Sequence, residues 1–188
     1  MIFKFIASLL SGFTIKLIDD YVDDELNDLD QMNIYKTILL YSILFIIVAA
    51  GIHVEYTVTI ISSCYMVGMF HDMYMKLPTK LRGYQESILL FLINVYLFSF
   101  YAIITSLIAI SIIQLIDDLC DRKWDKKYGY KNFANQFGKV EIIIISFILI
   151  ILLAMLEYRK LLIIMMAYTL IHFMYKKALH KVKRRENI

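Results

Sequence analysis

The sequence predicts an all-α membrane protein, a bundle of about seven transmembrane helices that forms a single integral-membrane domain over residues 1–188. Two observations support this. Hydrophobic residues make up 60% of the 188-residue chain and charged residues 20%, whereas soluble domains have about 45–50% apolar and about 25% charged residues. The apolar residues also form long runs, most of them close to the roughly 20 residues that a helix needs to cross a bilayer.

The apolar runs define the predicted helices in order. They cover residues 2–20, 33–50, 55–70, 86–101, 103–121, 140–156 and 160–176. The division between the fourth and fifth is the least marked, because no charge, glycine or proline interrupts residues 87–116.

The distribution of basic residues supports this division and orients the chain. With seven spans, 16 of the Lys and Arg residues fall on one face and only Lys4, Arg159 and Lys160 on the other. Lys and Arg are concentrated on the cytoplasmic side of membrane proteins. We therefore expect a multi-pass protein of the cell membrane with its N-terminus outside, its C-terminus inside and a basic cytoplasmic tail at 176–188. No groove of basic and aromatic residues indicates a nucleic-acid partner.

Acidic residues gather in two matching stretches at the cytoplasmic ends of the first and fifth predicted helices. Both begin Leu-Ile-Asp-Asp-x-x-Asp, at Leu17 and at Leu115. Residues about four apart share a face of a helix, so each stretch makes a stripe. The first stripe is Asp20, Asp23 and Asn27; the second is Asp117, Asp121 and Asp125, with Asp118 beside it.

Two such stripes favour a bound divalent cation. Like charges at these spacings repel each other, and carboxylates at a membrane boundary are costly unless they are solvated or paired. Mg²⁺ takes oxygen ligands and is typically held by a few carboxylates together with substrate phosphate oxygens. The pattern therefore predicts a metal-bridged diphosphate site, in preference to two solvated helix ends.

The two stripes resemble the aspartate motifs of the UbiA superfamily of intramembrane prenyltransferases. That family carries N-D-x-x-D-x-x-x-D on an early helix and D-x-x-x-D four helices later. The first motif reads Asp19-Asp20-x-x-Asp23-x-x-x-Asn27 here, with Asp in place of the first Asn and Asn in place of the last Asp. The second reads Asp121-x-x-x-Asp125 and is followed by a basic loop with Gly129 and a closing Phe-Gly138.

A cytoplasmic loop adds to the resemblance. Tyr74-x-x-x-Pro-Thr-Lys80-Leu-Arg82-Gly-x-x-Glu86 is similar to the family loop whose basic residues contact the diphosphate. The resemblance implies diphosphate contacts from Lys80, Arg82, Lys76 and Tyr74. It implies catalytic roles for Asp20, Asp23, Asp121 and Asp125, and a Mg²⁺ ligand set of Asp19, Asp20, Asp23, Asn27, Asp117, Asp118, Asp121 and Asp125.

The implied activity is Mg²⁺-dependent ionisation of an allylic isoprenyl diphosphate in the membrane, followed by transfer of the prenyl group to an acceptor. A membrane terpene synthase that cyclises or hydrolyses the diphosphate without an acceptor is the alternative within the family. Lys and Arg are scarce after the first motif, where only Lys36 follows soon. This scarcity favours the terpene synthase alternative. A non-enzymatic ion pathway or assembly factor is the third possibility. Prenyl length, acceptor, product and oligomeric state stay open.

Overall fold

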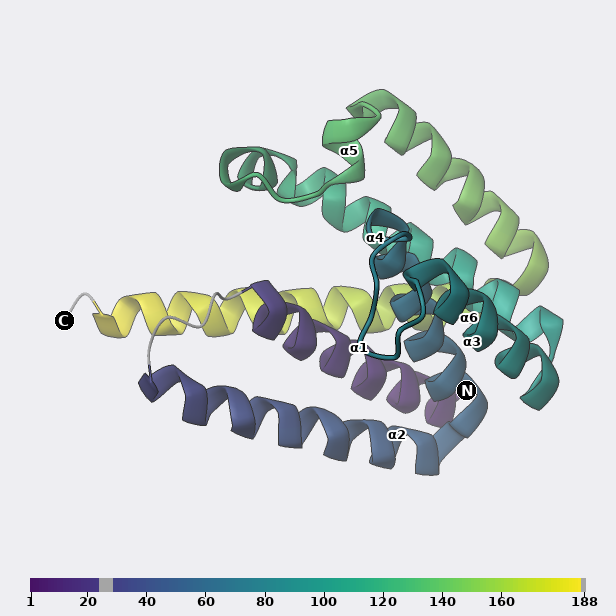
Figure 1. The fold of residues 1–188 in the computed structure, drawn as a ribbon, viewed down its shortest axis with the longest axis horizontal. Coiled ribbons are helices and arrows are strands. Elements are labelled where there is room, and N and C mark those ends of the chain that lie inside the picture. Colours follow the sequence, from purple (N-terminus) through teal and green to yellow (C-terminus); the bar gives the residue numbers. More distant parts are fainter. Residues whose placement is uncertain (24–28, 187–188) are drawn as a thin grey trace. The chain divides into compact units, whose positions relative to one another are not determined.

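The computed structural model describes residues 1–23 and 29–186, and the side chains of 1–18, 39–70 and 72–174. Its elements are α1 (Ile2–Asp23), α2 (Leu29–Gly68), the short 3₁₀ turn η1 (Met69–His71), α3 (Gly83–Leu97), α4 (Phe100–Tyr128), α5 (Phe133–Gln136) and α6 (Lys139–Glu186) (Figure 1). Over these ranges, β structure is limited to an isolated antiparallel bridge between Lys76 and Arg82. The all-helical prediction is confirmed.

Three described helical stretches are long and apolar enough to cross a membrane. They are Leu39–Gly68, Phe100–Tyr128 and Lys139–Met174. Many of their large apolar side chains are exposed, including Phe147 at 64% and Met155 at 81%. Soluble monomers rarely expose apolar surface on this scale, and lipid is the environment that makes it favourable. By length and composition, these three helices support the prediction of a membrane protein with transmembrane helices.

Each of the two longest helices contains one residue with a non-helical backbone. In α2 it is His53, with φ −157° and ψ 90°; in α6 it is Glu157, with φ −148° and ψ 76°. His53 restarts the helix as an N-cap does, because its Nδ1 accepts a hydrogen bond from the Tyr56 amide at 3.4 Å. Both interruptions lie between apolar runs that the sequence predicts as separate helices.

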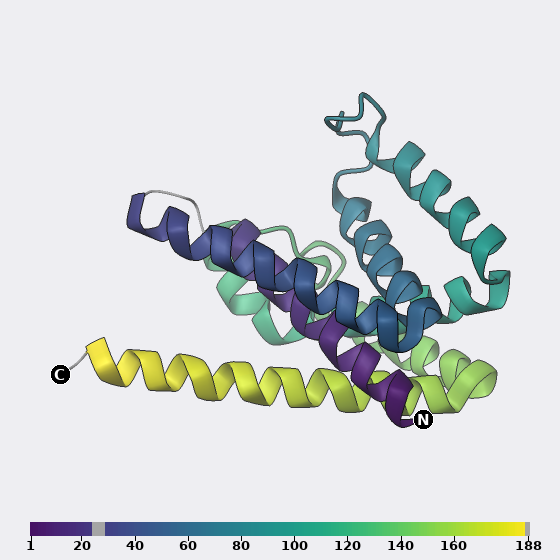
Figure 2. The same ribbon diagram turned by 90° about the horizontal axis from the view of Figure 1, so that it is seen from below.

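The chain divides into two compact units, Met1–Thr57 with Leu162–Ile188, and Val58–Leu161. In the first unit, α1 packs against the early part of α2, where Phe13 and Phe45 meet edge to face at 5.7 Å. Gly12 lets α6 approach α1, because a Cβ on Gly12 would lie 2.7 Å from Ile171 Cδ1. Figure 1 and Figure 2 both show α1 beside these segments.

In the second unit, α4 is the central helix. One face of it is buried and rich in small residues, namely Ala102, Thr105, Ser106 and Ala109. The Ser106 hydroxyl donates to Thr59 Oγ1 on α2 at 2.8 Å, and both side chains are fully buried. Small side chains let helix backbones approach closely, which is how helices associate where water does not drive them together.

The boundary between α3 and α4 lies a few residues before the predicted one. The helices end and begin around Phe98 and Ser99 rather than between residues 101 and 103. Ser99 is the N-cap of α4, and its side chain accepts from the Ala102 amide at 3.0 Å. At its other end α4 continues through the charged residues beyond 121 to Tyr128. It stops at Gly129, which adopts a left-handed conformation (φ 77°) that glycine tolerates.

Lys160, which the sequence assigns to the outer face, is buried. Its side chain is 1% exposed. Its ammonium donates to the Ala102 carbonyl at 3.0 Å and to Thr105 Oγ1 at 2.8 Å. Close by, the Tyr101 hydroxyl donates to the Leu156 carbonyl at 2.5 Å. The interruption at Glu157 therefore places the next turn of α6 against the first turn of α4.

Candidate functional site at the acidic end of α4

Four aspartates occupy the last turns of α4. Since successive helical residues are rotated by about 100°, Asp117, Asp121 and Asp125 follow a stripe about 80° wide. Around the helix axis, Asp118 lies about 100° from Asp117, close in angle to Asp125. It is buried, with 5% of its surface exposed, whereas Asp121 is exposed. The four carboxylates therefore have different surroundings.

Asp118 holds the segment that follows α4. Its Oδ2 accepts a hydrogen bond from the Phe133 amide at 2.7 Å, and its Oδ1 accepts from Gln114 at 3.0 Å. Its backbone carbonyl accepts from the Asn132 side chain at 2.8 Å. Both carboxylate oxygens thus have protein donors, so the structure gives Asp118 a role in positioning the loop.

Asn132 links this loop to the acidic stripe. Its amide nitrogen also donates to Asp125 Oδ2 at 2.6 Å, and its side-chain oxygen caps α5 by accepting from the Asn135 amide at 3.0 Å. Asn135 in turn donates to the Arg122 carbonyl at 3.0 Å. The segment after Gly129 is therefore a folded cap on the end of α4.

Sequence reasoning identified the basic and glycine residues of this cap but not its asparagines. The available signal was Asn132, a residue type favoured at N-caps, three residues before Asn135, which is the spacing between an N-cap acceptor and the backbone amide that donates to it. The partners Asp118 and Asp125 lie 14 and 7 residues earlier, and spacing within α4 alone does not reveal those contacts.

The loop between η1 and α3 carries the predicted diphosphate contacts. It forms a small hairpin in which the Lys80 amide donates to the Leu77 carbonyl and the Leu77 amide donates to the Leu81 carbonyl, both at 2.9 Å. Tyr74, Lys76, Lys80 and Arg82 are all exposed on it. Glu86 anchors the hairpin by accepting hydrogen bonds from Thr79 and from Tyr65 of α2. The four residues are therefore presented to the surroundings by a fixed loop.

The hairpin and the cap meet through one ion pair. Lys131 Nζ lies 2.5 Å from Asp72 Oδ1. Because Lys131 adjoins Asn132, which contacts Asp125, a continuous chain of contacts joins the hairpin to the acidic stripe. The sequence predicts that both loops lie on one face, and this contact places them at the same end of the second unit.

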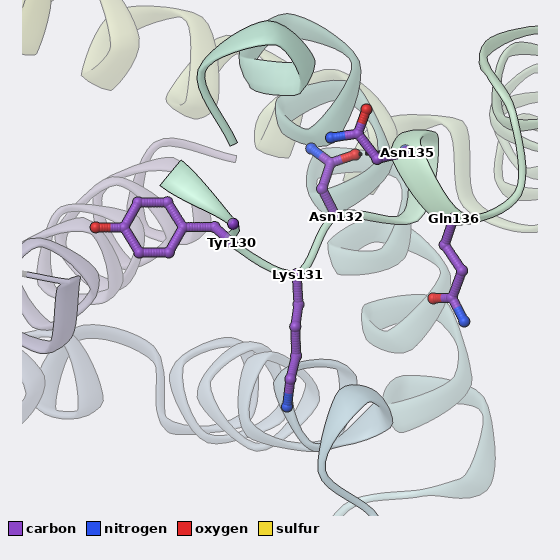
Figure 3. A pocket seen from close by; sticks show the side chains of 6 residues that line it. Tyr130, Lys131, Asn132, Asn135 and Gln136 are labelled. Carbon is purple, nitrogen blue, oxygen red and sulfur yellow. Dashed lines mark hydrogen bonds between the residues drawn. The ribbon is translucent and has the colours of Figure 1, made fainter. Parts of the chain in front are cut away.

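An open pocket lies in the cap. It has a volume of about 460 Å³ and is lined by Gly129, Tyr130, Lys131, Asn132, Asn135 and Gln136. Figure 3 shows Asn132 and Asn135 turned to one side of the loop and Lys131 turned to the other. The asparagines hold the cap to α4, and Lys131 is available to the hairpin.

A second, apolar groove lies elsewhere on this unit. It has a volume of about 440 Å³ and is lined by Leu119 of α4 and by residues of α6 such as Ile143 and Phe147. Leu119 is rotated by roughly 160–200° from Asp121 and Asp117 on α4. The groove therefore opens away from the acidic stripe, and we do not assign a prenyl chain to it.

The first motif belongs to the other unit. Asp19, Asp20 and Asp23 lie in the last turns of α1, but their side chains fall outside the described set, and Asn27 falls outside the described residues. Among the residues that are described, no three His, Cys, Asp or Glu side chains converge as metal ligands. The Mg²⁺ site and its first-motif ligands stay predictions.

The donor chemistry of the second motif is compatible with Mg²⁺. Asp117, Asp121 and Asp125 supply carboxylate oxygens, the ligand type that this hard cation prefers. Asp125 uses Oδ2 towards Asn132 and retains Oδ1. No family model, curated protein or solved structure matches the chain.

Replacing Lys80 with glycine should stabilise the hairpin. Lys80 has φ 69°, in the left-handed region that costs an L-residue about 1–2 kcal/mol, and glycine avoids this cost while losing about 0.4–1 kcal/mol through a more flexible unfolded chain. We expect the free energy of unfolding to rise by about 0.5 kcal/mol, measured by thermal unfolding in detergent. Lys76→Gly, in the extended bridge position, is the control and should lower it. Equal destabilisation by both variants would contradict the strain argument.

Proposed function

We propose that the chain is a Mg²⁺-dependent intramembrane prenyltransferase. It would ionise an allylic isoprenyl diphosphate and transfer the prenyl group to a small or lipid-like acceptor. The observation that carries the proposal is the arrangement of the second unit. The stripe of Asp117, Asp121 and Asp125 lies at the same end as a hairpin with three exposed cations, tied to it through Asp72–Lys131 and Asn132–Asp125.

The reaction needs opposite charges close together. When the allylic C–O bond breaks, its electron pair stays with the diphosphate, and negative charge grows on the leaving group. Lys76, Lys80 and Arg82 would stabilise that charge, as fixed cations do in phosphoryl and acyl transfer. Bound Mg²⁺ would supply further neutralisation of the diphosphate oxygens. Asp121 and Asp125 would hold the metal–diphosphate complex at the end of α4.

The first motif completes the proposal. By the resemblance, Asp19, Asp20, Asp23 and Asn27 would provide a second set of metal ligands, with Asp20 and Asp23 as catalytic residues. Tyr74 would join the cations of the hairpin in contacting the diphosphate.

Seven membrane crossings fit this reading. With a rise of 1.5 Å per residue, the 40 residues of α2 and the 48 residues of α6 would be about 60 and 72 Å long if straight, about twice the thickness of the hydrocarbon core. The interruptions at His53 and Glu157 divide each of them into two shorter helical pieces. In the second unit, the Lys131–Asp72 pair and the Tyr101–Leu156 contact join the segments that this topology assigns to the inside and to the outside, respectively.

The test is an activity assay on the purified full-length protein in detergent. Geranyl, farnesyl and geranylgeranyl diphosphates are each supplied with Mg²⁺ and without an acceptor. Released diphosphate is measured, organic extracts are analysed by mass spectrometry, and binding is measured with and without a chelator. A transferase is expected to bind at least one of these diphosphates only when Mg²⁺ is present, with little release until an acceptor is added.

Other outcomes discriminate between the alternatives. Rapid release with a new hydrocarbon or alcohol would indicate a terpene synthase or hydrolase, the reading that the scarcity of basic residues after the first motif favours. Absence of binding to all three diphosphates would overturn the enzymatic proposal and favour an ion pathway or an assembly role. The Asp20→Ala, Asp121→Ala double variant is the control, and it should lose turnover while still inserting into membranes.

A further inference from the structure

The C-terminal end of α4 carries an exposed cluster of aromatic rings. Trp124 and Tyr128 are 4.6 Å apart between ring centroids, and Tyr130 continues the cluster at 6.2 Å from Tyr128. Their exposed fractions are 60%, 50% and 47%, respectively. Tyr128 is also the last residue of α4, a helix whose apolar part is long enough to cross a membrane. Trp and Tyr at such positions sit at the depth of the lipid headgroups.

Basic and acidic residues lie on opposite sides of this aromatic cluster. Counting about 100° per residue from Trp124, Lys127 and Lys123 lie about 60° and 100° to one side, and Asp121 and Asp125 lie at the same angles to the other side. Lys127 Nζ stands 5.2 Å from the centre of the Tyr128 ring, and Lys123 is exposed. The aromatic rings thus lie between the two lysines on one side of the helix and Asp121 and Asp125 on the other.

An apolar ridge continues from the basic side into the span. Around the helix axis, the ridge lies on the same side of Trp124 as the lysines. Ile113 is about 20° from Trp124, Cys120 about 40° and Ile116 about 80°. Cys120 is exposed, and the two isoleucines are half-buried. The surface therefore offers, in sequence along the helix, two cations, aromatic rings at headgroup depth and a path for a hydrocarbon chain.

We propose that this surface, formed by Lys123, Trp124, Lys127 and Tyr128, is a binding site for the headgroup of an anionic membrane phospholipid. The lysines attract the phosphate, the rings pack against the glycerol region, and one acyl chain lies along Cys120 and Ile116. The apolar ridge distinguishes this occupant from free phosphate. The site borders the acidic stripe, because Asp117 lies about 20° from Trp124 on α4, but it does not depend on the enzymatic proposal.

Trp124 makes the site measurable, because it is the one tryptophan in the sequence. The full-length protein is reconstituted into phosphatidylcholine vesicles that contain a fixed fraction of either dibrominated phosphatidylglycerol or dibrominated phosphatidylcholine. Bromine quenches tryptophan fluorescence at short range, so the ratio of quenching gives the relative affinity at this site. Each lysine near an anionic lipid should contribute roughly a fivefold preference. With two lysines at the site, we expect a preference of roughly 25-fold for the anionic lipid.

Variants in the same turns of α4 provide matched controls. Lys127→Gln should reduce the preference by roughly fivefold, and Lys123→Gln with Lys127→Gln should abolish it. Lys126→Gln removes the same charge at about 160° from Trp124 and should have little effect. Lys176→Gln with Lys177→Gln controls for net charge and should also have little effect.

Several results would overturn the proposal. Equal quenching by the two brominated lipids in the wild-type protein would show that no anionic lipid is selected. An equal effect of Lys126→Gln and Lys127→Gln would show general surface attraction rather than a site. Loss of the preference on adding inorganic phosphate at constant ionic strength would indicate a phosphate site. These comparisons hold even if the double variant fails to fold, because the single variants carry the test.

Discussion

Replacing Asp121 with asparagine should reduce Mg²⁺-dependent diphosphate release, measured with the required acceptor, by roughly a hundred- to a thousandfold, the range found when one electrostatic contact to a reacting group is removed. Asp121 is the exposed central member of the acidic stripe, between Asp117 and Asp125. Asparagine keeps the size of the side chain and removes its negative charge. The measurement is the initial rate of diphosphate release at saturating Mg²⁺, followed by a Mg²⁺ titration, in which the variant should require a higher concentration.

Glu141→Gln is the matched control for this variant. Glu141 is an exposed carboxylate in the first turn of α6, outside both motifs, and losing its charge should leave the rate within about twofold, because isolated surface charges contribute little. If Asp121→Asn and Glu141→Gln behave alike, the stripe is a solvated helix end and the proposed metal role of Asp121 is wrong.

Replacing Asp118 with leucine should have the largest effect on stability. The substitution removes a buried carboxylate that accepts from the Phe133 amide at 2.7 Å and from Gln114 at 3.0 Å. It leaves a partly buried amide without its acceptor. Loss of a hydrogen bond to a charged group, with an unsatisfied donor left behind, costs about 2–3 kcal/mol. We expect faster amide hydrogen exchange in residues 129–138, measured by mass spectrometry, and a lower thermal midpoint.

Asp118→Asn separates the positioning role from metal ligation. Asparagine retains one oxygen that can accept from the Phe133 amide, so the cap should exchange only slightly faster than in the wild-type protein. If Asp118 positions the cap, this variant keeps most of the turnover that Asp121→Asn loses. A loss of turnover as large as that of Asp121→Asn, with normal exchange, would restore Asp118 to the set of metal ligands. Wild-type exchange in Asp118→Leu would show that the cap does not depend on this carboxylate.

Composition and apolar runs were sufficient to predict the helical class, the membrane character and the approximate ends of most helices. The gaps between runs coincide with His53 and Glu157, because charged or polar residues there interrupt otherwise apolar sequence. The α3–α4 boundary was misplaced because Ser99, a single capping residue inside a long apolar run, decides it. One serine hydroxyl barely changes the mean hydropathy of a long apolar run, so a hydropathy pattern does not locate this boundary.

The candidate site was predictable only in part. Spacing on a helix correctly grouped Asp117, Asp121 and Asp125 on one stripe of α4. It did not distinguish Asp118, whose surroundings depend on residues 14–15 positions later. The hairpin of Lys76, Lys80 and Arg82 was recognised from its residue types, but its attachment to the cap depends on Asp72 and Lys131, which are 59 residues apart in the sequence. Contacts at such separations follow from tertiary packing and not from a local pattern.

The buried ammonium of Lys160 constrains the order in which the chain can assemble. Its acceptors, the Ala102 carbonyl and the Thr105 hydroxyl, come 58 and 55 residues earlier in the chain. Burial of a charged ammonium is costly unless it has hydrogen-bond partners, and these acceptors offset part of that cost once α4 is already in the membrane. During synthesis α4 emerges first, so the second part of α6 inserts beside an existing partner. A chain in which these helices were permuted would meet the lysine before its acceptors and should insert poorly.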